Sequence, residues 1–234
     1  MKTHIIVRVY LAISVLCFGL AMPLSAATIY NNSTNDLTLR FDPGTNQVGN
    51  EIILAGTDRY LTDFSFEYWG TSLHPGTFSG TIQADVQFYL NDGTPFNGYA
   101  SPGTSLFNSG WFSVPAPTDR NTFDFSIADG DFGPGGLFLP VQSNMTWTVQ
   151  FRGMGAGDSV GVDLYGPPSV GQAYGDYWDL GPTGWGLMTN SAAPPYANFS
   201  ADMVATVPEP SSMALSVLGG MGLLIMLRRF RRKE

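Results

Sequence analysis

The chain has 234 residues, of which 44% are hydrophobic and 13% are charged, and its formal net charge is −8 at pH 7. Residues 28–207 contain four arginines and no lysine against seventeen acidic residues, which gives this part a net charge of −13. Such a surface repels phosphates, so the charge argues against nucleic acid and against anionic membrane surfaces as partners. About 180 residues are enough for one domain with a substantial core.

The first 27 residues are typical of a secretory signal peptide. A basic start is followed by the apolar run Val9–Leu20 and then by small residues, with cleavage predicted after Ala27 or after Ala26. We therefore expect export through the Sec machinery. Cys17 is the only cysteine and lies inside the apolar run, so the exported domain must depend on its hydrophobic core and not on disulfides.

Alternation of apolar and polar side chains predicts strands through most of residues 28–206. The segment 145–152 places Met145, Trp147, Val149 and Phe151 on one face. The same pattern occurs in four more segments: 60–69, 82–90, 121–128 and 198–205. In 121–128 the residues expected to face inward are Phe123, Phe125 and Ile127. Weaker candidates are 36–41, 51–54, 107–114 and 160–165. Turn residues separate these segments and no long stripe has helical period, so we predict an all-β domain, an antiparallel β-sandwich of jelly-roll type.

The region 165–195 differs from the rest because it is rich in Gly, Pro and aromatic residues and alternates only weakly. We expect a long ordered excursion with one or two short strands, packed by Trp178 and Trp185, because flexible linkers are poor in aromatic residues.

Residues that could carry catalysis are scarce. His74 is the only histidine after the leader and lies in a predicted turn, which argues against a Ser–His–acid triad and against zinc. No Gly-rich stretch is followed by the Lys-Ser/Thr pair of a phosphate-binding loop. The sequence therefore predicts a protein that is not an enzyme, while a hydrolase with paired carboxylates stays open as a third interpretation.

Two sets of residues could bind a ligand. Asp124, Asp129 and Asp131, with Asp158 and Asp92 in other turns, offer the oxygen ligands that Ca²⁺ prefers. Their spacing is not that of an EF-hand, and Asp is also a common turn residue, so the prediction is no cofactor, with structural calcium as the alternative.

The second set is aromatic. Trp69 and Tyr89 fall on the phase opposite to the predicted core, and Asp176, Tyr177 and Trp178 combine rings with carboxylates in a predicted loop. Sugar rings present apolar C–H faces that stack on flat side chains, and neighbouring polar groups bind their hydroxyls. These five residues are the candidates for a carbohydrate site if they are exposed, although Trp and Tyr are buried on average.

The C-terminal segment, residues 207–234, has three parts in a fixed order. Val207 leads into Pro208, Glu209 and Pro210, and a hydrophobic helix is predicted over 212–227. The apolar run 213–227 would rise about 22 Å as a helix, somewhat less than the roughly 30 Å hydrocarbon core of a bilayer. The basic end at 228–233 would remain on the cytoplasmic side; its cations are Arg228, Arg229, Arg231, Arg232 and Lys233.

This arrangement resembles the PEP-CTERM signal, which membrane-embedded exosortases recognise in Gram-negative bacteria. The resemblance covers about an eighth of the chain and implies processing near Pro208–Pro210, delivery to the cell surface or extracellular matrix, and association with exopolysaccharide. It predicts an exported structural component of biofilm material, anchored in the inner membrane transiently or stably before delivery. The alternative is a carbohydrate-binding module with an exposed aromatic site.

Overall fold

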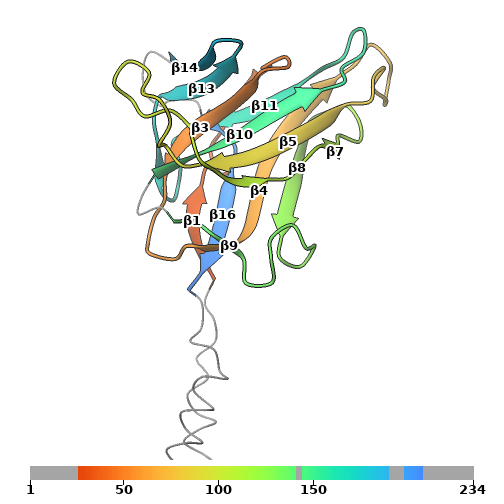
Figure 1. Cartoon of the computed structure of the whole chain (residues 1–234). Coiled ribbons are helices and arrows are strands. Elements are labelled where there is room, and N and C mark those ends of the chain that lie inside the picture. Colours follow the sequence, from red (N-terminus) through yellow and green to blue (C-terminus); the bar gives the residue numbers. More distant parts are fainter. Residues whose placement is uncertain (1–25, 141–143, 190–197, 208–234) are drawn as a thin grey trace, which may run out of the picture.

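The structure, a computed structural model, describes residues 26–140, 144–189 and 198–207, and these contain strands and no helix. Two antiparallel sheets of eight strands each make up the fold (Figure 1). Sheet A contains β1 (Ala27–Asn31), β2 (Asp36–Phe41), β4 (Tyr60–Thr71), β8 (Thr118–Ser126), β9 (Leu137–Phe138), β11 (Ser159–Tyr165), β15 (Asn198–Phe199) and β16 (Asp202–Thr206). Sheet B contains β3 (Gln47–Ile53), β5 (Gln83–Tyr89), β6 (Ser105–Asn108), β7 (Phe112–Ser113), β10 (Asn144–Arg152), β12 (Gln172–Ala173), β13 (Asp176–Gly181) and β14 (Gly184–Thr189).

The strand β4 organises sheet A. Ser65 pairs with Asp124 of β8 on one side and with Asp202 of β16 on the other, so β4 is an interior strand. Further along β4, Tyr68 pairs with Asn121 of β8 on one side and with Val162 of β11 on the other. β16 and β11 therefore follow one another along the same edge of β4. In sheet B, β10 lies between β3 and β5. The chain crosses repeatedly between the two sheets. Examples are the connections from β3 to β4, from β4 to β5 and from β10 to β11.

One face of each sheet packs against the other to form the core. The Phe64 ring of sheet A lies 4.9 Å from the Phe88 ring and 5.4 Å from the Trp147 ring of sheet B, between centroids, in edge-to-face geometry. The predicted core phase of 145–152 is confirmed, because Met145, Trp147, Val149 and Phe151 are all completely buried. Packed aromatic rings from both sheets therefore lie in the core.

Some details of the strand prediction were wrong. Ile127 was expected to face the core, but β8 ends one residue earlier and Ile127 is exposed at the start of a turn. In β10, Thr146 and Thr148 lie on the face opposite the core, as expected, yet both are completely buried. The reason is that the outer face of sheet B is itself covered.

The covering element is a hairpin in the region 165–195, where one or two short strands were expected but their pairing was not predicted. Strands β13 and β14 pair through a tight turn in which Gly184 has a φ of +106°, a value that favours glycine. Trp185 of β14 and Tyr89 of β5 have ring centroids 5.8 Å apart. Four strand spacings separate β14 from β5, roughly 19 Å on a flat sheet, so the hairpin must curl over the outer face of sheet B.

The two ends of the described domain meet in sheet A. Ala27 of β1 pairs with Ala205 of β16, and both strands reach the same end of the domain, the lower end in Figure 1. The predicted leader and the predicted hydrophobic helix over 212–227 lie outside the described residues. Among those residues, no helix has the length and apolarity needed to span a membrane.

Candidate functional site

The five residues predicted for a carbohydrate site do not lie together on one surface. Trp69 belongs to sheet A and Tyr89 to sheet B, and both lie on outer faces, so they are on opposite sides of the domain. Trp69 was expected to be exposed, but only 9% of its surface is accessible. The guanidinium of Arg40 lies over its ring at 5.9 Å from the centroid. This ring cannot stack on a sugar in the arrangement observed.

The cluster in β13 is divided between the two faces of sheet B. Trp178 pairs with Gly49, which pairs with Thr148, so it lies on the outer face, yet it is completely buried. Tyr177 points toward the core, where its ring lies 5.0 Å from that of Phe41. The expectation that Tyr177 and Trp178 share an exposed loop surface was therefore wrong, because the segment is a strand and adjacent residues point to opposite faces.

Tyr89 packs against Trp185 of the hairpin. Its ring meets Trp185 edge to face, and both rings are half-buried. The Tyr89 hydroxyl donates to Gln87 Oε1 and accepts a hydrogen bond of 3.1 Å from Gln47 Nε2, which also donates to Thr148 Oγ1 at 2.8 Å. We call Tyr89 and Trp185 the aromatic corner. It combines partly accessible rings with amide and hydroxyl groups, the chemistry that a saccharide site requires.

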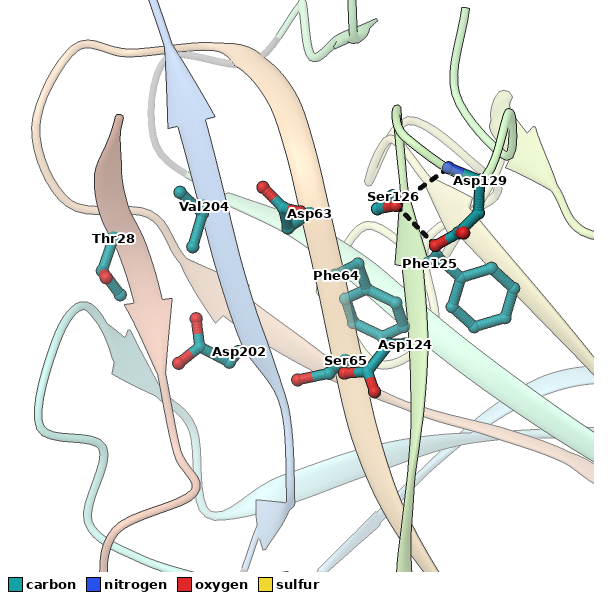
Figure 2. Close-up of a pocket in the computed structure, with 10 residues that line it drawn as sticks. All are labelled: Thr28, Asp63, Phe64, Ser65, Asp124, Phe125, Ser126, Asp129, Asp202 and Val204. Atoms are coloured by element: carbon teal, nitrogen blue, oxygen red, sulfur yellow. Dashed lines mark hydrogen bonds between the residues drawn. The ribbon is translucent and has the colours of Figure 1, made fainter. Parts of the chain in front are cut away.

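A second feature is an acidic depression of about 420 Å³ on the outer face of sheet A (Figure 2). Asp63, Asp124 and Asp202 line it from the neighbouring strands β4, β8 and β16, together with Asp129. Burial raises the pKa of Asp202, although a hydrogen bond from the Asn31 amide acts in the opposite direction. The apolar residues Phe64, Phe125 and Val204 line it beside the carboxylates, and all of its lining residues except Asp129 belong to strands.

Two of the three calcium candidates, Asp129 and Asp131, fix the turn that follows β8. Asp129 accepts a hydrogen bond of 2.7 Å from the Ser126 hydroxyl, and Asp131 accepts one of 2.9 Å from the Ser126 amide. Within the ranges that the structure describes, no group of three or more Asp, Glu, His or Cys side chains is arranged to hold a metal ion. Calcium binding at Asp124, Asp129 and Asp131 therefore stays a prediction, without a preformed cage to support it.

Asp158, named with these residues, joins two loops. Its carboxylate accepts hydrogen bonds from the amides of Ser79, Gly80 and Gly155 at 2.9, 2.7 and 2.9 Å. Partial desolvation raises its pKa, but these bonds and one from the Ser72 hydroxyl outweigh that effect and lower the pKa to about 2. Its role in the structure is to hold the loops together.

A charged network covers another part of sheet A. Asp163 is 3% exposed, and its Oδ1 lies 3.5 Å from Arg40 Nε. Desolvation raises the pKa of Asp163 to about 6; Arg40 and Arg120 lower it, and Glu67 raises it further. Glu67 accepts hydrogen bonds from Tyr165 at 2.5 Å and pairs with Arg120 Nε at 3.1 Å. Both carboxylates are thus bound to basic groups of the same sheet.

The junction with the C-terminal segment is well defined. Met203 and Ala205 of β16 are completely buried, Thr206 is the last strand residue, and Val207 is 54% exposed. One residue therefore separates an interior strand from the motif that begins at Pro208. Pro208 and the residues after it lie outside the described ranges.

Comparison with protein families identifies this segment. A family model described as the PEP-CTERM protein-sorting motif matches residues 206–232. The chain carries a PEP-CTERM sorting motif. The expectation drawn from Val207–Pro210, the apolar run and the basic end is thereby confirmed, and it implies export and processing by an exosortase, a membrane protein. No curated protein and no solved structure matches this chain.

Proposed function

We propose that this protein is a structural component of the cell surface or extracellular matrix, associated with exopolysaccharide in biofilm, and that it is not an enzyme. The observation that carries the proposal is the junction between β16 and the PEP-CTERM motif. The whole of β16 lies before Pro208, so cleavage at Pro208–Pro210 releases a domain that keeps all its strands. An acidic surface with a net charge of −13 favours a soluble, self-repelling product.

The same proposal covers the export signal, the membrane anchor and the connectivity of the sheets. The signal peptide 1–27 directs Sec export, and the helix over 212–227 with its basic end holds the precursor in the inner membrane until the peptidase acts. Jelly-roll connectivity is supported by the repeated crossing of the chain between sheets from β3 to β11.

The test is to replace Pro208, Glu209 and Pro210 together by alanine in a Gram-negative host that contains an exosortase. Full-length precursor should accumulate in the inner membrane, while the wild-type domain is found outside the cell. Replacement of Pro115 and Pro117 by alanine is a matched control, since it makes the same Pro→Ala changes in the loop between β7 and β8 and leaves the tail intact. Normal release of the tail variant would refute processing at this motif.

A second candidate function, carbohydrate binding, is favoured by the aromatic corner. Tyr89 and Trp185 are half-buried and meet edge to face, and the Tyr89 hydroxyl is hydrogen-bonded to the amide side chains of Gln47 and Gln87. Saturable binding of the organism's exopolysaccharide should be lost in Tyr89→Ala and Trp185→Ala. Trp111→Ala is the control, because the guanidinium of Arg152 already lies 3.9 Å from that ring centroid. Equal binding by all three variants would eliminate the corner as a sugar site.

A further inference from the structure

The end of the domain at which the sorting tail begins carries exposed apolar side chains. Phe138 of β9 is 52% exposed and Val207 is 54% exposed. The Tyr60 ring lies 5.0 Å from the Phe138 ring, and Tyr60 is the strand partner of Thr206, which precedes Val207. We call Tyr60, Phe138 and Val207 the apolar end patch. Three separate parts of the chain bring it together beside the tail junction.

The length of the tether keeps this patch near the membrane. Only residues 208–212 separate Val207 from the apolar run that starts at Met213. Fully extended chain spans at most about 3.6 Å per residue, so Val207 lies within roughly 22 Å of Met213. A compact domain of 180 residues has a radius of gyration of about 16 Å and is roughly 40 Å across. The tether is therefore too short for the domain to turn its far end toward the bilayer.

We propose that the apolar end patch rests on the lipid–water interface while the tail is anchored, a proposal that depends on the membrane insertion of the tail proposed above. Aromatic side chains favour the interfacial region of a bilayer, and exposed apolar groups gathered at one end of a soluble domain mark an interaction surface. Contact there would hold Pro208–Pro210 at the depth where a membrane-embedded peptidase acts.

The charges around the patch determine which lipid surface it fits. Asp58 adjoins Arg59 next to Tyr60, and Asp129 and Asp131 lie in the loop that leads to β9. Acidic groups outnumber the basic one, so the attraction is apolar and anionic lipids oppose it. The partner is therefore a zwitterionic membrane surface.

The experiment uses residues 28–234, the chain without its predicted leader and without a native cysteine, inserted into phosphatidylcholine nanodiscs and carrying one nitroxide-labelled cysteine at a time. Gly135→Cys reports on the patch, since a Cβ at Gly135 meets no atom within 4 Å. Leu73→Cys is the control: Leu73 is 81% exposed and follows the far end of β4, roughly 36 Å along the strand from Tyr60. Leu218→Cys reports whether the tail is in the bilayer.

A label at Gly135 should be several-fold less accessible to a water-soluble nickel chelate than one at Leu73, and Phe138→Ser should weaken docking about tenfold and remove the difference. Equal accessibility at Gly135 and Leu73, with Leu218 shielded, would overturn the patch and leave the proposed function intact. Shielding at Gly135 that survives Phe138→Ser would also overturn it. An accessible label at Leu218 would refute both proposals, because the tail would not be in the membrane.

Discussion

Phe88→Ala is the sharpest test of the core arrangement. Phe88 is completely buried in β5, and its ring contacts Phe64 of the opposite sheet at 4.9 Å and Phe107 of β6 at 5.1 Å. Replacing a buried Phe by Ala costs about 3–5 kcal/mol in free energy of unfolding, because apolar contact is lost and a cavity remains. For a domain of this size each kcal/mol lowers the melting temperature by about 2–4 °C, so we expect a decrease of roughly 6–20 °C.

Phe138→Ala provides a matched control with the same chemical change at a ring that is half exposed. Within the described part of the chain its ring contacts only that of Tyr60, so we expect a cost of about 1 kcal/mol or less. Urea unfolding of residues 26–207, followed by tryptophan fluorescence, gives both free energies, with an unchanged slope showing that the variants remain comparable. Costs for the two variants that agree within about 0.5 kcal/mol would refute the assignment of Phe88 to the interface between the sheets.

Three other outcomes are expected. Ending the chain after Val207 should leave the melting temperature, measured by calorimetry, unchanged. Ending it after Ala201 removes the interior strand β16 and should abolish cooperative unfolding. Equal behaviour of the two truncated chains would contradict the topology. The pKa of Asp163, about 6 when folded, exceeds the unfolded value of about 3.9, so its contribution is complete below about pH 4 and is lost as the pH rises through about 6. The stability of wild type relative to Asp163→Asn in urea should therefore fall over that window, and a constant difference would show that the carboxyl is not desolvated. Asp158, with a pKa of about 2, has the opposite sign: wild type should lose its advantage over Asp158→Asn in melting temperature as the pH falls from about 4 toward 2, and no change would mean that its loop hydrogen bonds are absent in solution.

The sequence predicted well where one face of a strand is apolar and the other polar. β10 is an example, since Trp147 and Val149 alternate with threonines and occupy the core as expected. In 165–195 one or two short strands were expected, but the pairing of β13 with β14 was not predicted because the glycines and prolines weaken the alternation. The signal for this pairing was present in Gly181-Pro182-Thr183-Gly184, four turn residues between two aromatic segments.

The candidate site was harder to predict because strand phase does not determine exposure. Trp69 and Trp178 both lie on outer faces of the sheets. The guanidinium of Arg40 lies over the Trp69 ring, and Trp178 is completely buried in the hairpin that curls over sheet B. Trp185 was overlooked as a partner of Tyr89, since the two are 96 positions apart in the sequence and meet only through the curvature of sheet B. By contrast, the sorting motif is local in sequence and could be read directly.

The most direct test of the account is the intact mass of the protein recovered from outside the cell and from the membrane fraction, compared between a host with an exosortase and the same host without it. We predict a product that starts at Ala27 or Thr28 and ends near Pro208–Pro210 in the first host. In the second host, the chain should keep all residues to Glu234 and remain in the membrane fraction. A released product that retains residues 211–234, or identical masses in the two hosts, would contradict the proposal that the tail is a processing signal.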